Sequence, residues 1–386
     1  MKSLTTYRSL VENQRVFDLI WSQMPQMQNR TSSSWWFVML FPRDGDVYGR
    51  RQLMFSVTTA VGQSIRINDV WMPGVDLQRP VIDGLDRFPA LSVGWYCDGQ
   101  TVHDDQFNQL AEVMLSYPDG RLACWTGQNG APPIGLDMDK ATGRDLALDF
   151  RVRGQDIAGQ FTAWGDLDGL HSSPHESVNI DTPLGGTHFI AWRRMNFAGE
   201  FDLPTGREAL SGIAYFQRVC LNVPLFPWKW IWAVFPDGSL FSSYVPYVGL
   251  NLLRNGYKYF DSNRQEQAHL NIAGAGFWDW PGPSEEILFT KARITPILNG
   301  RAHADFLVQV SNKKGDFLSF IARPYGKTRN YLDRRILGQY LASHWDYNEF
   351  LFTMEQLAGR VSGRPITRET MGQAFGTLEY TYGVGF

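Results

Sequence analysis

Cysteine is scarce in this sequence of 386 residues, which contains only Cys97, Cys124 and Cys220. An odd number of widely spaced cysteines forms neither a disulfide framework nor a zinc-binding pattern. Residues 1–28 also lack the continuous apolar core of a secretory signal. We therefore expect a reducing compartment and predict a cytoplasmic location.

A strong charge of either sign is absent as well. The chain has 36 basic and 39 acidic residues, with a formal net charge of −3. Its basic runs, such as Arg193-Arg194 and Lys313-Lys314, are too short to follow a phosphate backbone. We predict no nucleic-acid partner. No apolar run is long enough to span a bilayer, which leaves only peripheral contact with membrane lipid open. The oligomeric state is not indicated by the sequence.

The nucleotide-binding motifs are incomplete. Gly326-Lys327-Thr328 ends like a phosphate loop, but Ile321 stands where the upstream glycine is required. Gly274-Ala275-Gly276 lacks the third glycine of a dinucleotide fingerprint because residue 279 is aspartate. These departures predict a protein without a nucleotide cofactor, and no other cofactor is indicated.

One polar segment, from Asp166 to Asp181, contains two histidines and several acids. Histidines four residues apart can bind a metal from one face of a helix. Here Pro174 lies between His171 and His175, which disfavours a helix. We interpret the segment as a polar loop between domains and predict no metal site.

Aromatic residues are abundant, at 14% of the chain with 25 phenylalanines. They occur in short apolar or alternating runs, such as Trp35–Phe41 and Trp228–Phe235, bounded by turn sequences. Two such turns are Pro236-Asp237-Gly238 and Asn299-Gly300, and the second is a strong hairpin signal. The pattern predicts a mainly β protein of two halves, each an antiparallel barrel-like sheet.

Two segments depart from the strand pattern. Apolar residues recur at helical spacing over residues 4–24, which predicts a short N-terminal helix, and a second helix is predicted around residues 329–342. Gly, Ser, Pro, His and Asp dominate residues 165–188, where the boundary between the halves is expected.

Two aspartates stand among aromatic residues. Asp279 lies between Trp278 and Trp280, and Asp346 follows Trp345. An apolar environment disfavours the charged carboxylate and raises its pKa, which suits a general acid near neutral pH. Either aspartate could instead point to water while its neighbours point inward. Glu379 and His188 are weaker candidates on the same reasoning.

A further aromatic pattern lies in the second half. Trp228, Trp230 and Trp232 alternate along one strand, so they share a face, with Lys229 opposite. Tyr215 and Gln217 share a face of the preceding strand. The tryptophans could form core packing, or a wall that stabilises a cation.

These positions resemble a known family. The stretch from Trp192 to Gly238 and the closing residues 378–383 are similar to the lipocalin-like proteins grouped with carotenoid 1,2-hydratase (hydroxyneurosporene synthase) and AttH. The resemblance implies two consecutive lipocalin-like β-barrel domains, over residues 31–180 and 181–386, which follow the N-terminal helical segment predicted from the spacing, over residues 1–30. It also implies hydration, cyclisation or rearrangement of long apolar isoprenoid or polyketide-like substrates. The family pattern favours a histidine at the start of the tryptophan strand, where this chain has Leu225-Phe226-Pro227.

Our first hypothesis is a cofactor-independent cyclase, isomerase or hydratase acting on a lipophilic, isoprenoid-like substrate. Asp279 or Asp346 would donate the proton, and a set of aromatic and polar residues would shape the pocket and shield a carbocation, namely Tyr215, Gln217, Trp228, Trp230, Trp232, Tyr244, Trp278 and Trp280. The alternatives are a non-catalytic carrier of an apolar small molecule and a scaffold without a cavity.

Overall fold

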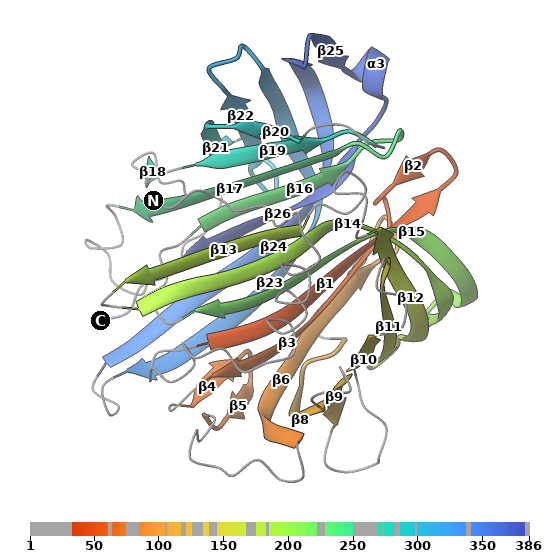
Figure 1. The fold of residues 1–386 in the computed structure, drawn as a ribbon, viewed down its shortest axis with the longest axis vertical. Coiled ribbons are helices and arrows are strands. Elements are labelled where there is room, and N and C mark those ends of the chain that lie inside the picture. The colour runs from red at the N-terminus through yellow and green to blue at the C-terminus, as the bar shows by residue number, and fades with distance from the viewer. Residues whose placement is uncertain are drawn as a thin grey trace.

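The structure is a computed structural model. It describes residues 33–60, 64–74, 85–104, 106–116, 121–125, 134–138, 145–166, 175–182, 185–221, 228–249, 269–271, 274–281, 286–297, 299–336 and 341–382. These residues form two large antiparallel sheets that pack against each other (Figure 1).

The first sheet has 13 strands and closes on itself. Its strands are β1 (Ser33–Asp44), β2 (Val47–Tyr48), β3 (Gln52–Ala60), β6 (Leu85–Cys97), β7 (Val102–His103), β8 (Gln109–Ser116), β9 (Arg121–Trp125), β10 (Ile134–Met138), β11 (Asp145–Arg153), β12 (Ala158–Asp166), β13 (His175–Thr182), β14 (Gly185–Leu203) and β15 (Gly206–Leu221). The order is β12-β11-β10-β9-β8-β6-β3-β1-β15-β14-β13, and the pairing of β12 with β14 completes a barrel. This pairing covers the edge of β12, whereas β13 pairs with β14 alone among the described strands.

The second sheet also has 13 strands, in the order β20-β19-β17-β16-β26-β24-β23-β22-β21 with four strands beside this path. They are β4 (Ile65–Ile67), β5 (Val70–Met72), β16 (Trp228–Val234), β17 (Leu240–Gly249), β18 (His269–Asn271), β19 (Ala275–Asp279), β20 (Ile287–Phe289), β21 (Lys291–Ile297), β22 (Asp305–Ser311), β23 (Phe317–Ile336), β24 (Leu341–Val361), β25 (Arg364–Thr367) and β26 (Phe375–Tyr382). One short helix, α3 (Arg368–Met371), precedes β26.

Strand β1 explains why the run Trp35–Phe41 is apolar without interruption. Side chains of a strand alternate between its two faces. Trp36, Val38 and Leu40 enter the core of the barrel, whereas Phe37 and Met39 enter a second core that also contains residues of β16 and β24. Both faces of β1 are therefore buried, and the second core lies between the two sheets.

The first part of the chain also contributes to the second sheet. Strand β4 pairs with β23, with Ile67 opposite Leu332 and Arg66 opposite Asp333. Asn68, in the turn between β4 and β5, donates through Nδ2 to Asn330 Oδ1 at 3.0 Å. Figure 1 shows β4 and β5 beside the end of β23. Strands β13–β15 belong to the first sheet, so the sheets change between Leu221 and Trp228, whereas the predicted domain boundary at residue 180 lies inside β13.

The predicted mainly β fold with barrel-like sheets is confirmed. The turn at residues 236–238 is also as predicted, because Gly238 has a positive φ of 83° and the Asp237 carboxylate accepts from Ser239. The helix predicted around residues 329–342 is wrong, since β23 and β24 occupy most of that range and pair with each other there. The predicted N-terminal helix lies outside the described residues.

Candidate active site between the two sheets

A row of five side chains crosses the second sheet on the face that meets the barrel. In register it runs Tyr244, Trp230, Glu379, Glu349 and Thr328, one residue from each of β17, β16, β26, β24 and β23. Side chains directly opposite each other on neighbouring strands share a face, with Cβ atoms about 5 Å apart. The sheet therefore places two carboxyl groups side by side.

Glu379 is 5% exposed and accepts two hydrogen bonds. Trp228 donates from Nε1 to Oε2 at 2.9 Å, and the Tyr347 hydroxyl donates to Oε1. Trp228 comes from β16 and Tyr347 from β24, so both strands that flank β26 orient the carboxyl group. Burial raises the pKa of Glu379 to about 7, although the two donors lower it.

Glu349 is fully buried and receives a donor from the barrel. Trp95 of β6, itself 1% exposed, donates from Nε1 to Glu349 Oε2. The other oxygen, Oε1, is buried and has no hydrogen-bond partner among the described residues. Burial, and then the neighbouring Glu379, raise the pKa of Glu349 well above its usual value, while donors including Trp95 and Tyr347 lower it.

The pair therefore holds at least one proton at neutral pH. Two carboxylates in a dry site repel each other strongly enough that one stays protonated, and the proton belongs to the pair as a unit. Tyr347 is also affected, because burial and both glutamates raise the pKa of its phenol well above 10. A buried carboxyl group that titrates near pH 7 can both give and take a proton in a catalytic cycle.

The three tryptophans of β16 share one face, as predicted, and this face is directed at the barrel. Trp232 is fully buried and its ring centroid lies 4.1 Å from that of Phe41. Trp230 is 8% exposed, and its ring lies 5.1 Å from Tyr215. Trp230 and Trp232 thus form core packing between the sheets, while half-buried Trp228 belongs to the glutamate pair.

Asp279 is buried as predicted, but its environment is not apolar. Its carboxylate lies 3.4 Å from Arg193 Nη1, and Arg193 also pairs with Glu286. A bulge in β14 between Trp192 and Met195 places Arg193 and Arg194 side by side, and Arg194 donates to the Asp279 carbonyl at 3.1 Å. The Asp279 carboxylate therefore lies beside a cation and not in the apolar environment that its sequence neighbours indicated. Its role as proton donor stays a prediction.

Asp346 is also ion-paired. Arg329, from the adjacent β23, donates to both carboxylate oxygens, with distances of 2.8 Å and 3.0 Å from Nη2. Burial still raises the pKa of Asp346, and Arg329 counteracts it. Asp346 lies three residues before Glu349, so its side chain points to the opposite face of β24 from the pair. A catalytic role for Asp346 likewise stays a prediction.

The remaining predicted residues lie in three places. Tyr244, the first of the five residues, is 45% exposed, and the removal of water from around its phenol, together with Glu379, raises the pKa of that phenol. Tyr215 is buried and donates to Gln217 Oε1 at 2.8 Å. Trp278 and Trp280 contact each other near Asp279, at a ring separation of 5.2 Å, and take no part in the row.

Sequence reasoning ranked Glu379 below the aspartates and missed Glu349. Each glutamate stands in a strand between residues of the opposite face, in Asn348-Glu349-Phe350 and Leu378-Glu379-Tyr380. An acid in an otherwise buried strand is a usable signal. The decisive fact, that the two are opposite each other, requires the pairing of β24 with β26.

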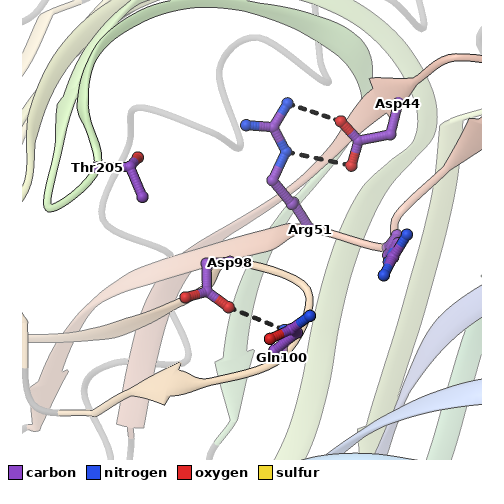
Figure 2. A pocket seen from close by; sticks show the side chains of 6 residues that line it. Asp44, Arg51, Asp98, Gln100 and Thr205 are labelled. Carbon is purple, nitrogen blue, oxygen red and sulfur yellow. Dashed lines mark hydrogen bonds and ion pairs between the residues drawn. The ribbon is translucent and has the colours of Figure 1, made fainter.

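A polar recess of about 420 Å³ lies elsewhere, among turns at one end of the barrel, and is lined by Asp44, Arg50, Arg51, Asp98, Gln100 and Thr205. Figure 2 shows the Arg51 guanidinium facing the Asp44 carboxylate, with Nη2 at 2.7 Å from Oδ1. Arg51 also binds Glu208 at 2.7 Å. Such a polar lining does not suit an apolar ligand. No three histidine, cysteine, aspartate or glutamate side chains gather as metal ligands in the part of the chain that the structure describes, and the His171 to Asp181 side chains and His188 lie outside it.

Comparisons with known proteins yield structural neighbours only. No protein-family model and no curated protein matches the sequence. Among solved structures, an AttH-type protein from Nitrosomonas europaea matches 92% of this chain and 96% of its own, with 11% identity and a TM-score of 0.41. Kievitone hydratase from Nectria haematococca matches 95% of this chain and 94% of its own, with 12% identity and a TM-score of 0.42. Likeness at this level carries no inference about activity.

Proposed function

We propose that this protein is an enzyme that transfers protons on a lipophilic substrate, with the Glu349–Glu379 pair as its acid and base. The observation that carries the proposal is the burial of two carboxyl groups side by side. Removing carboxyl groups from water costs free energy, and groups perturbed in this way cluster at functional sites. The substrate class predicted from the sequence is isoprenoid-like, and the reaction is a hydration, isomerisation or cyclisation.

The location of the pair supports this function. Glu379 and Glu349 lie on the face of the second sheet that meets the barrel, and Trp95 reaches Glu349 from the barrel side. Both sheets therefore contribute to the same site. Aromatic side chains next to it, Trp228, Trp230 and Tyr244, provide surface for an apolar ligand, and Tyr244 is the most exposed of the five residues in the row.

The test is to incubate the protein in D2O with isoprenoid alcohols, ketones and polyenes and to detect deuterium or added water by mass spectrometry. We expect Glu379→Gln and Glu349→Gln each to lower the rate by about 100-fold or more, the usual contribution of a general acid or base. Asp279→Asn and Asp346→Asn are the comparison variants. Full activity in both glutamine variants would refute the proposal, and loss only in an asparagine variant would restore the aspartate hypothesis. Saturable binding without turnover would indicate a carrier.

A further inference from the structure

We propose, on the basis of the proposed function, that the substrate carries a carbonyl group next to or conjugated with the reacting carbon. Glu379 is the base that takes the proton from carbon, and neutral Glu349 donates a hydrogen bond to the carbonyl oxygen. The substrate is thus an enolisable or α,β-unsaturated ketone or aldehyde with a lipophilic body, and not an isolated alkene.

The contacts of the pair assign the two roles. Glu379 accepts from two donors, Trp228 Nε1 and the Tyr347 hydroxyl, which stabilise its charged form. Glu349 has the Trp95 donor at Oε2. Tyr347 also lowers the pKa of Glu349, but its hydroxyl makes its hydrogen bond to Glu379, and Glu349 Oε1 has no hydrogen-bond partner among the described residues. The negative charge is therefore better placed on Glu379 and the proton on Glu349. A protonated carboxyl group has an O–H donor that a carboxylate lacks.

The chemistry of a weak buried acid restricts the substrate. Protonating an isolated alkene creates a carbocation and requires a strong acid. Burial and the adjacent carboxyl group make this pair a weak acid and a correspondingly strong base. A strong base suits removal of a proton from a carbon that a carbonyl group acidifies. A carboxyl group kept neutral at pH 7 by an apolar site is an effective donor to the resulting oxyanion.

The steps balance without a further reactant other than water. The Glu379 carboxylate takes the proton from carbon, the C–H electron pair forms a C=C bond, and the carbonyl π pair moves to oxygen, where it accepts from the Glu349 O–H. Return of the proton from Glu379 to the conjugated carbon gives the isomer. Alternatively, water adds to the β-carbon of an unsaturated ketone, its proton passes to Glu379, and that proton then goes to the α-carbon, which gives the hydrate.

Deuterium exchange on a matched pair of compounds tests the inference with the full-length protein. β-Ionone is a lipophilic conjugated ketone, and β-ionol has the same skeleton with an alcohol in place of the carbonyl. After incubation in D2O, carbon-bound deuterium is counted by mass spectrometry, with a protein-free sample as blank. We expect labelling of β-ionone and none of β-ionol.

Variants then separate the two roles. Glu379→Gln has no carboxylate base, so labelling should fall by about 100-fold. In Glu349→Leu the hydrogen-bond donor is absent, so labelling of β-ionone should fall as far. Glu349→Gln retains an N–H donor, so labelling should fall less. Glu200→Gln changes an exposed carboxylate on β14 and should match the wild type.

The outcomes also separate this inference from the proposed function. Labelling or hydration of β-ionol or another alkene lacking a carbonyl, but not of β-ionone, would overturn the inference and leave the proton-transfer function intact. Equal labelling of β-ionone in the wild type, Glu379→Gln and Glu349→Leu would overturn the assigned roles. Labelling of neither compound would overturn the inference, and an inactive isoprenoid panel would then overturn the proposed function as well.

Discussion

Replacing Glu379 by glutamine should change how the stability of the protein depends on pH. Burial raises the pKa of Glu379 from 4.5 to about 7 in the folded protein. The folded state therefore binds this proton more tightly than the unfolded state. The stabilisation that results is complete below about pH 4.5 and is lost as the pH rises through about 7. This rise in the pKa corresponds to roughly 3–4 kcal/mol, because a tenfold change in proton affinity is worth about 1.4 kcal/mol.

Urea unfolding followed by tryptophan fluorescence at about pH 5 and about pH 8.5 measures the effect. Glutamine does not titrate, so the loss of stability between the two pH values should be smaller in Glu379→Gln than in the wild type, by roughly 2–3 kcal/mol. The readout is the difference between the pH values, so any constant change from altered hydrogen bonds cancels. Glu200→Gln, at an exposed and ion-paired glutamate, should retain the wild-type dependence. Identical pH dependence of Glu379→Gln and the wild type would refute the argument that Glu379 is buried with a raised pKa.

Three further changes test other parts of the structure. Asp279→Asn leaves buried Arg193 without one of its anionic partners. The urea midpoint should fall by an amount equivalent to about 3 kcal/mol. An unchanged midpoint would show that the ion pair does not contribute to stability. Gly376→Ala places a Cβ 2.2 Å from the Trp232 carbonyl oxygen and should cost roughly 1–3 kcal/mol, which thermal unfolding would detect. Trp95→Phe keeps an aromatic ring but removes the hydrogen bond to Glu349. The free energy of unfolding should fall by about 1–2 kcal/mol, and the pH–activity profile should change. An unaltered profile would contradict the role of Trp95 in the site.

The sequence predicted strands and turns well because their signals are local. The run Trp35–Phe41 is apolar throughout, and the turn at Asp237 has the glycine that its positive φ requires. Which core each face of β1 enters was not predictable, because this depends on packing between two sheets. The error at residues 329–342 arose where long paired strands overrode a local preference for helix.

The site was predicted less well for a geometric reason. The aromatic residues on either side of Asp279 were taken as its surroundings, yet neighbours along a strand point to the opposite face. The environment of a strand residue is set by the residues across from it, such as Glu349 for Glu379. Arg193, which contacts Asp279, stands at a bulge in β14. Register and bulges depend on pairing between distant segments and are not visible in a local pattern.

The β4–β5 hairpin has a consequence for how the chain is made. It is synthesised among the first strands, but its partner, β23, follows much later in the sequence. During synthesis, β4 therefore leaves the ribosome before β23 exists, and its edge stays unpaired while the barrel strands β6–β15 are synthesised. Unpaired edges invite association with other chains. If the gene is divided between Leu221 and Trp228, β4 and β23 are on separate fragments and each lacks its partner. Each fragment expressed alone should therefore aggregate more than the intact chain, and coexpression of the two should restore the solubility of both.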